Sequence, residues 1–304
     1  MTYKNARRVN FGAISGALFS ALQWRLLLLW LLLLALPTAV AMLPLWGALG
    51  NLLDHSVHAE EWGRQFHMMV FDDVLMGLRD QIPMLHNAML SGLLLTLLLA
   101  PFLTGMVVGA GRAGRALGFG QLLQSGIIEY GRMFRLMLWS LLPLGIAVGL
   151  TMLGSNMADE HAEKAVLESQ VVAAEHAVQC LAVLAFVLMH AVIESARAAF
   201  IADVGLRSAT RALGRGFMQL LRRPLSTLFT YVLVSLIGYL LVLSLGMARI
   251  QTVAVSAGGF VLALLLAQLI VAVVGWTRTA RLFALAEVSA SLTGARRAGL
   301  SLEP

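Results

Sequence analysis

Long apolar runs without a single charged residue constrain this chain more than any other feature of its sequence. A helix that crosses the roughly 30 Å hydrocarbon core of a membrane needs about 20 such residues. Five runs reach this length without interruption: 26–46, 88–111, 136–158, 224–248 and 250–277. A sixth run, 171–193, is interrupted by Glu175 near one end. The sequence therefore predicts an all-α integral membrane protein.

The composition also favours a membrane-embedded chain. Of the 304 residues, 59% are apolar and only 12% are charged, and the mean hydropathy is +0.83. A soluble domain carries about a quarter charged residues, so this chain has too little polar surface to remain in water. No Gly/Ser-rich or Pro-rich tract marks a linker, and we interpret residues 1–304 as a single polytopic membrane domain.

We predict six transmembrane helices. Only Arg249 separates the last two runs, and one helix through both would be about 80 Å long, so the chain must reverse near residues 248–251. The first run contains Ala39-Val40-Ala41, which resembles a signal-peptide cleavage site, but its 21 residues exceed the usual length of about 7–15, which favours an uncleaved anchor. The predicted spans are 26–46, 88–111, 136–156, 171–193, 224–247 and 252–277.

Lys and Arg are distributed unequally between the two sides of the predicted membrane. Of the 22 basic residues, 18 fall on the side that holds both termini, and the other side keeps Arg64, Arg79, Lys164 and Arg249. The first two loops of that other side are rich in Asp and Glu. Under the positive-inside rule, we expect a multi-pass inner-membrane protein with both termini in the cytoplasm.

The even-numbered spans end in similar sequences. Residues 107–115 read VVGAGRAGR, residues 273–281 read VVGWTRTAR, and residues 192–200 read VIESARAAF with the middle arginine in the same place. We interpret the chain as three repeated helical hairpins. Each repeat would consist of an amphipathic cytoplasmic connector helix, a span outward, an outer connection and a span back.

Amphipathic connector helices are predicted at 5–24, 116–134, 205–223 and 279–293. Along 205–223, Arg207, Arg211 and Arg215 recur every four residues beside an apolar side. A four-residue step turns a helix by about 400°, so the three arginines would stay on one flank. We expect them to contact anionic lipid, and the alternative is that they only enforce topology.

The fourth span is the most polar. An ionisable residue inside a membrane helix is energetically expensive and marks a functional candidate. We predict an intramembrane polar site of His190, Glu194 and Arg197, in which His190 and Glu194 pair. In the alternative interpretation, Glu194 and Arg197 pair at the headgroups and leave His190 as a buried hydrogen bonder. The outer half of the span carries Glu175, His176, Gln179 and Cys180.

Metal, cofactor and nucleotide motifs are weak or absent in the sequence. His55, His58 and Glu61 are three residues apart and form a candidate metal half-site without a third ligand, and the alternative is a solvated acidic loop helix. Residues 109–114 fit G-x-G-x-x-G, but they follow a transmembrane helix rather than a strand. Their plainer meaning, together with Gly105, is a small-residue face that lets another helix approach closely.

We therefore assign no catalytic residue and expect no cofactor. The sequence contains no G-x-S-x-G elbow, P-loop or H-E-x-x-H motif, and Cys180 is its only cysteine, which excludes an intramolecular disulfide. Whether the chain is an enzyme stays open, because the absence of a motif does not exclude activity.

Residues 207–224, RSATRALGRGFMQLLRRP, precede a span and resemble a recurring element of uncharacterised six-helix bacterial inner-membrane proteins. These include YciC-like proteins and the membrane domain fused to some glycerophosphodiester phosphodiesterases. The resemblance implies an all-helical six-span bundle in a bacterial cytoplasmic membrane. No phosphodiesterase domain accompanies it here, so the resemblance implies no catalytic residue and no activity.

Three classes of function remain. The leading hypothesis is a non-enzymatic scaffold or accessory subunit of a membrane complex. The alternative is a small transporter or permease component whose polar fourth span lines a path, and the third is a membrane-embedded enzyme that acts on lipid. The expected partners are the phospholipid bilayer with its anionic lipids, and other membrane proteins or a second copy of the chain, but not nucleic acid.

The charge distribution makes a direct prediction about topology. Alkaline phosphatase fused after Glu61 or Glu163 should be active, because the enzyme folds only outside the cytoplasm. The same reporter fused after Arg211 or at Pro304 should be silent. Activity at Arg211 would invert the topology, and silence at Glu61 would indicate a missing or extra span.

Overall fold

A computed structural model describes residues 11–53, 68–165 and 167–300, with side chains described as far as residue 292. The described residues are almost entirely helical and form no strand, which confirms the all-α prediction. The elements in chain order are α1 (Phe11–Ser20), α2 (Trp24–Leu53), α4 (Met68–Gly77), the short 3-10 helix η2 (Arg79–Gln81), α5 (Ile82–Ala113), α6 (Phe119–Ala162), α7 (Glu168–Ala202), α8 (Ala209–Arg222), α9 (Pro224–Ile250) and α10 (Ala257–Leu300).

Among the described residues, six helices are long and apolar enough to cross a membrane. Each of them contains one of the predicted apolar runs, although the last run begins a few residues before α10. The chain is therefore a multi-pass membrane protein, as the apolar runs predict. The candidate spans are Trp24–Leu53, Arg79–Ala113, Phe119–Ala162, Glu168–Ala202, Pro224–Ile250 and Ala257–Leu292.

Helix boundaries follow from local chemistry. Helix α5 ends at Gly114, whose φ of 62° is the left-handed conformation that glycine adopts without a steric penalty. Helix α8 begins after Ser208, whose hydroxyl accepts a hydrogen bond from the Arg211 backbone N–H. Helix α9 begins at Pro224, whose missing N–H is not needed in the first turn.

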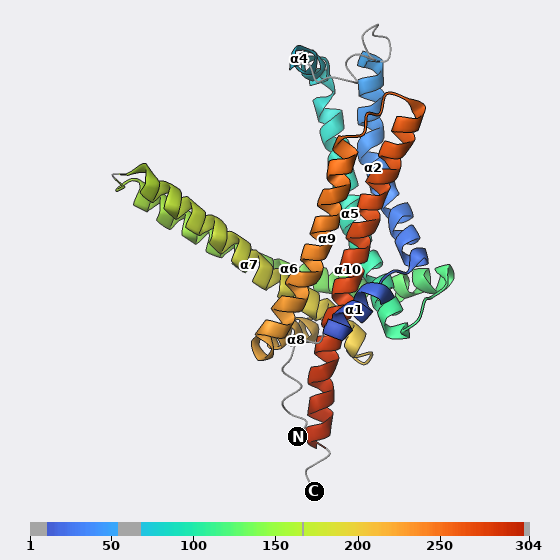
Figure 1. Cartoon of the computed structure of the whole chain (residues 1–304), viewed down its shortest axis with the longest axis vertical. Helices are drawn as coiled ribbons and strands as arrows, with labels where there is room; N and C mark the ends of the chain where they lie inside the picture. The colour runs from blue at the N-terminus through green and yellow to red at the C-terminus, as the bar shows by residue number, and fades with distance from the viewer. Residues whose placement is uncertain (1–10, 54–67, 166, 301–304) are drawn as a thin grey trace.

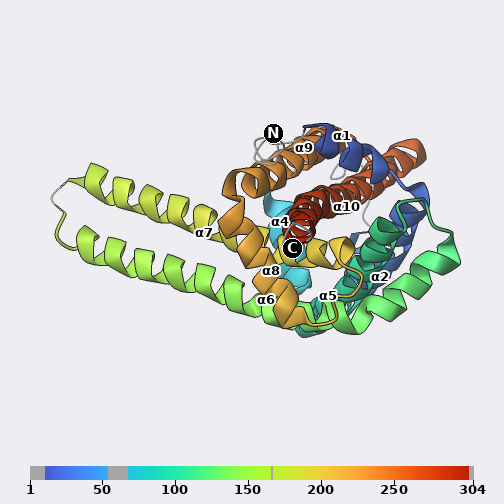
Figure 2. The ribbon, with the colours of Figure 1, turned by 90° about the horizontal axis from the view of Figure 1, so that it is seen from below.

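Four of the long helices run side by side, and the other two leave them. Figure 1 shows α2, α5, α9 and α10 along the long axis, while α6 and α7 extend away as a hairpin, and Figure 2 shows the same divergence from below. We call residues 148–184 the arm. None of the described residues in the arm is buried, whereas the flanking Ala147 and Ala185 are.

The predicted connectors differ from one another in the structure. Helices α1 and α8 are separate, but residues 116–134 contribute to a single helix with the third span in α6, and residues 279–293 continue α10. The cause is local: Pro224 disfavours a helical conformation at Arg223, whereas no proline lies between residues 119 and 136. Helix α1 packs on α10, the first half of α6 packs on α5, and α8 packs on α7.

Small residues allow these helices to approach closely. A Cβ atom on Gly109 would lie 2.3 Å from the Cβ of Ser125, and one on Gly105 would lie 3.1 Å from the carbonyl oxygen of Gly126. The small-residue face predicted on α5 therefore packs against α6. On α8, a Cβ on Gly216 would lie 2.4 Å from the carbonyl oxygen of Val192 in α7.

The buried core lies where α2, α5, α7 and α10 meet. Its fully covered side chains include Leu26, Met106, Phe200 and Leu282. Polar side chains are buried in the same region, and Glu194 is one of them. This region positions the candidate site.

The contact at Gly216 generates a prediction for helix packing. Gly216→Ala should destabilise the protein by about 1–3 kcal/mol, because the new methyl group would meet the α7 backbone, which cannot move aside like a flexible side chain. Gly214→Ala on the same helix is the matched control. Nothing lies within 4 Å of its added Cβ, and alanine favours a helix by up to about 1 kcal/mol.

Thermal unfolding in detergent distinguishes the two variants. The Gly216→Ala midpoint should fall below that of the wild type, and the Gly214→Ala midpoint should equal or exceed it. Equal midpoints for the two variants would contradict the close approach of α8 to α7.

Candidate functional site

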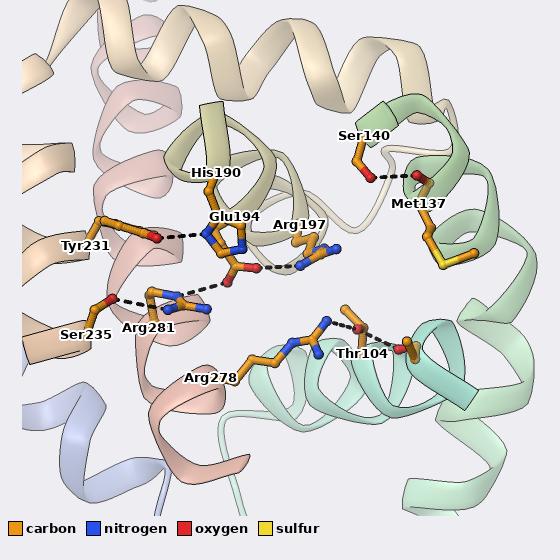
Figure 3. Close-up of polar contacts among 11 residues, drawn as sticks. Thr104, Met137, Ser140, His190, Glu194, Arg197, Tyr231, Ser235, Arg278 and Arg281 are labelled. Atoms are coloured by element: carbon orange, nitrogen blue, oxygen red, sulfur yellow. Dashed lines mark hydrogen bonds and ion pairs between the residues drawn. The ribbon is translucent and has the colours of Figure 1, made fainter. Parts of the chain in front are cut away.

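Glu194 on α7 is a carboxylate with none of its surface exposed. Its Oε1 accepts a hydrogen bond from Arg197 Nη1 at 2.5 Å, and its Oε2 accepts one from Arg281 Nε at 3.1 Å. Figure 3 shows the two arginines reaching the carboxylate from opposite sides. A buried charge is tolerated when it is paired and hydrogen-bonded, and both oxygens of Glu194 meet that condition. The ion pair with Arg281 connects α7 to α10.

The residue spacing explains how the two helices form this contact. Glu194 and Arg197 are three residues apart on α7, and Arg278 and Arg281 are three residues apart on α10. Residues at this spacing lie on one face of a helix, one above the other. Helices α7 and α10 are packed neighbours, so each presents its pair toward the other.

His190 lies one turn before Glu194 and binds a residue of α9. Its Nδ1 lies 2.8 Å from the Tyr231 hydroxyl, and its ring stacks on Phe186 with 5.4 Å between the ring centroids. Arg281 lies over the Tyr231 ring, 5.2 Å from its centroid, and donates to Ser235 Oγ at 3.1 Å. These contacts add α9 to the junction of α7 and α10.

Arg278 extends the network to the first two spans. Its Nη2 donates to Thr104 Oγ1 on α5 at 3.1 Å, and its guanidinium lies over Trp30 of α2, 5.6 Å from the centroid. One group of residues thus joins α5, α7, α9 and α10, and Trp30 of α2 packs against it. We call this group the polar cluster: Thr104, His190, Glu194, Arg197, Tyr231, Ser235, Arg278 and Arg281 (Figure 3).

A second buried carboxylate lies between α5 and α6. Glu129 accepts hydrogen bonds from Arg112 at 2.5 Å and from Arg132 at 3.1 Å. Arg112 also donates from Nε to the Phe200 carbonyl oxygen on α7 at 2.8 Å. This contact holds the base of the hairpin against α5.

A cavity of about 550 Å³ opens beside the polar cluster, between α7, α9 and α10. Ligand sites commonly measure about 300–1,000 Å³, so the cavity is of suitable size. Glu194 and the three arginines in its lining come from α7 and α10, whereas α9 contributes Gly238, Tyr239 and Val242, none of them charged. A larger cavity of about 710 Å³ near α1 carries only Arg115 and Glu287 as charged lining residues among those described.

The structure brings the predicted polar site together with partners that the sequence did not predict. Glu194 binds Arg197, as in the alternative interpretation, but the pair lies inside the helix bundle and His190 bonds to Tyr231 rather than to Glu194. Sequence reasoning does not identify Arg278 and Arg281 as site residues, because arginines at the end of a span also fit the positive-inside pattern. The available signal in the sequence is their spacing after Val273, which repeats the pattern of residues 107–115.

The predicted lipid contacts are arranged differently from the expectation. Arg207 precedes α8, so only Arg211 and Arg215 lie on that helix. Both are exposed, and Arg215 donates to Asp203 at 2.6 Å. The face of α8 that packs against the protein carries Ala212, Gly216 and Gln219, while Phe217 is half exposed.

The candidate metal ligands His55, His58 and Glu61 lie outside the described residues. Within the part of the chain that the structure describes, no group of three His, Cys, Asp or Glu side chains is placed to hold a metal ion.

Comparisons with protein-family models, with curated proteins and with solved structures gave no match to this chain.

The buried ion pair predicts a strong energetic coupling. Glu194→Ala should cost about 3–5 kcal/mol of unfolding free energy, because it leaves Arg197 and Arg281 without their buried counter-charge. Arg215→Gln is the control. It breaks the half-exposed Arg215–Asp203 pair. Such a pair contributes only about 0–1 kcal/mol to stability, because water and salt screen it.

A double-mutant cycle with Glu194→Ala and Arg281→Ala measures the coupling directly. The double variant should be more stable than the sum of the single losses implies, because the second substitution removes a charge that the first had left unpaired. Additive losses would show that the two residues do not interact.

Proposed function

We propose that this chain is a non-enzymatic scaffold or accessory subunit that holds another integral membrane protein through its arm. The observation that carries this proposal is the divergence of the α6–α7 hairpin from the other spans (Figure 1). The arm projects from a base fixed by buried ion pairs, and no described residue within it is buried. Its apolar surface is therefore available to a partner in the membrane.

Polar residues on the arm favour a protein partner over lipid alone. Glu175 and Gln179 are four residues apart on α7, so they share a face, and both are exposed. Val183 extends that face by the same four-residue step, Val172 lies three residues before Glu175, and both valines are exposed. A carboxylate that faces lipid is costly, whereas a partner protein can supply hydrogen bonds within an apolar surround.

The polar cluster suits a scaffold better than a transport path. A path requires polar groups that exchange their partners for a substrate. Both oxygens of Glu194 are instead held by arginines, and Tyr231 holds His190. A permease component is the second candidate function, because a cavity adjoins the cluster.

The proposal includes three repeats, a bacterial inner-membrane location and cytoplasmic termini. The repeats are supported by a recurring contact, in which α1 packs on α10, the first half of α6 on α5, and α8 on α7. The orientation is supported by the 18-to-4 distribution of basic residues. The location is supported by the resemblance of residues 207–224.

Site-specific photo-crosslinking in cells tests the arm. A photoreactive amino acid at Leu153 or Val183, which are 61% and 64% exposed on α6 and α7, should form an adduct with one defined membrane protein. The same residue at Leu265 of α10, 60% exposed on the bundle, is the matched control and should give no protein adduct. Replacing Glu175 and Gln179 with alanine should weaken the adduct at Val183.

Two outcomes would overturn the proposed role. One is the absence of any protein adduct from both arm positions, which would leave lipid as the only neighbour of the arm. The other is an adduct that contains two copies of this chain and no other protein.

A further inference from the structure

The cavity beside the polar cluster carries more positive than negative charge. Arg197, Arg278 and Arg281 line it, and Glu194 is the only carboxylate among its lining residues in the described part of the chain. Even with His190 neutral, the surplus is two positive charges. The ion pairs of Glu194 use Arg197 and Arg281, so the surplus is greatest around Arg278.

Arg278 has a neutral partner instead of a carboxylate. Among the described residues, its guanidinium donates only to the Thr104 hydroxyl, at 3.1 Å, and its face lies over the Trp30 ring. A guanidinium carries five N–H donors, so further donors remain for a ligand. In a region shielded from water, an uncompensated cation favours a bound anion.

We propose that this cavity binds a phosphate group, presented either by an anionic phospholipid headgroup or as free phosphate. Planar arginine forks match phosphate oxygens with two parallel hydrogen bonds, and three guanidinium groups converge on this cavity. Figure 3 shows Arg278 extending below the Glu194 ion pairs, with Arg197 and Arg281 on either side.

The apolar lining residues of the cavity suit the acyl part of a lipid. Tyr239 of α9 and Val274 of α10 line it and are 60% and 50% exposed. Helices α9 and α10 are in close contact at Gly238, where a Cβ would lie 2.2 Å from Thr277 Oγ1. Helices α7 and α9 both line the cavity, and Figure 1 shows the arm diverging from α9. A lipid can enter from that side with its headgroup on the arginines.

Equilibrium binding to the purified, delipidated full chain in detergent tests the proposal by native mass spectrometry. The wild type should bind phosphatidylglycerol at least about tenfold more tightly than phosphatidylcholine, whose choline cation opposes its phosphate. Arg278→Gln should lose about tenfold in phosphatidylglycerol affinity, the loss expected for a charge-assisted hydrogen bond. Arg135→Gln is the matched control, because Arg135 is exposed on α6 and does not line the cavity.

A second measurement distinguishes the two sources of phosphate. If inorganic phosphate displaces phosphatidylglycerol from the wild type and raises its unfolding midpoint, free phosphate occupies the same site. If it does neither while the lipid preference persists, the lipid headgroup is the ligand. Arg278→Lys keeps the charge but loses the planar fork. It should therefore also bind less tightly, and it replaces Arg278→Gln if that variant does not fold.

Two results would overturn the proposal. One is equal affinity for both lipids together with no effect of inorganic phosphate. The other is an equal loss of phosphatidylglycerol affinity in the Arg278 and Arg135 variants, which would show general electrostatic attraction. Neither result bears on the arm, so this test is independent of the proposed scaffold role.

Discussion

The packing of this protein depends on a carboxylate that has no access to water. Glu194 is fully buried, so arginines must reach it, and one of them is fixed on another helix. That requirement brings α7 against α10 at one level along both helices. Arg281 then contacts Tyr231 and Ser235 of α9, while Arg278, one turn away, contacts Thr104 of α5. One buried charge thus sets the relative positions of four helices.

The same constraint explains why the hairpin is held only at its base. The buried residues of α7 begin at Ala185 and continue to Phe200, and the ion pairs of Glu194 and Arg197 lie within that segment. Arg112 completes the attachment through Glu129 on α6 and the Phe200 carbonyl. Beyond Ala147 and Ala185, the described residues of α6 and α7 have no buried contacts with the bundle, so the arm can diverge from it (Figure 2). The same distribution of buried contacts therefore anchors the base of the hairpin and lets the arm diverge.

The six spans could be predicted from the sequence because hydrocarbon thickness imposes a length that apolar runs either reach or do not. The small-residue face of Gly105 and Gly109 was predictable for a similar reason, since only a missing side chain permits such close packing. The partners of Glu194 were not predictable. Arg281 is 87 residues away along the chain, and an arginine at the end of a span looks the same whether it faces headgroups or a buried acid.

Connector boundaries were predictable only where the chain carries a steric signal. Pro224 separates α8 from α9, and the residue before it, Arg223, leaves the helical conformation. Periodicity alone gave no boundary between residues 116–134 and the third span, because a helix continues unless something interrupts it. The helix predicted over 205–223 begins later in the structure, at Ala209, because Ser208 caps its N-terminus.

Equivalent arginines in the three proposed repeats have acquired different partners, and this difference accounts for the charge surplus beside the polar cluster. Arg112 binds Glu129 and Arg197 binds Glu194, so two of the three are neutralised within the protein. Arg278 occupies the third equivalent position and meets only a hydroxyl and an indole ring among the described residues. Glu194 occupies the place of a glycine in the other two copies, and this additional carboxylate pairs with Arg197 and Arg281 but not with Arg278. The asymmetry of an otherwise repeated pattern thus creates both the anchor of the arm and the cationic cavity next to it.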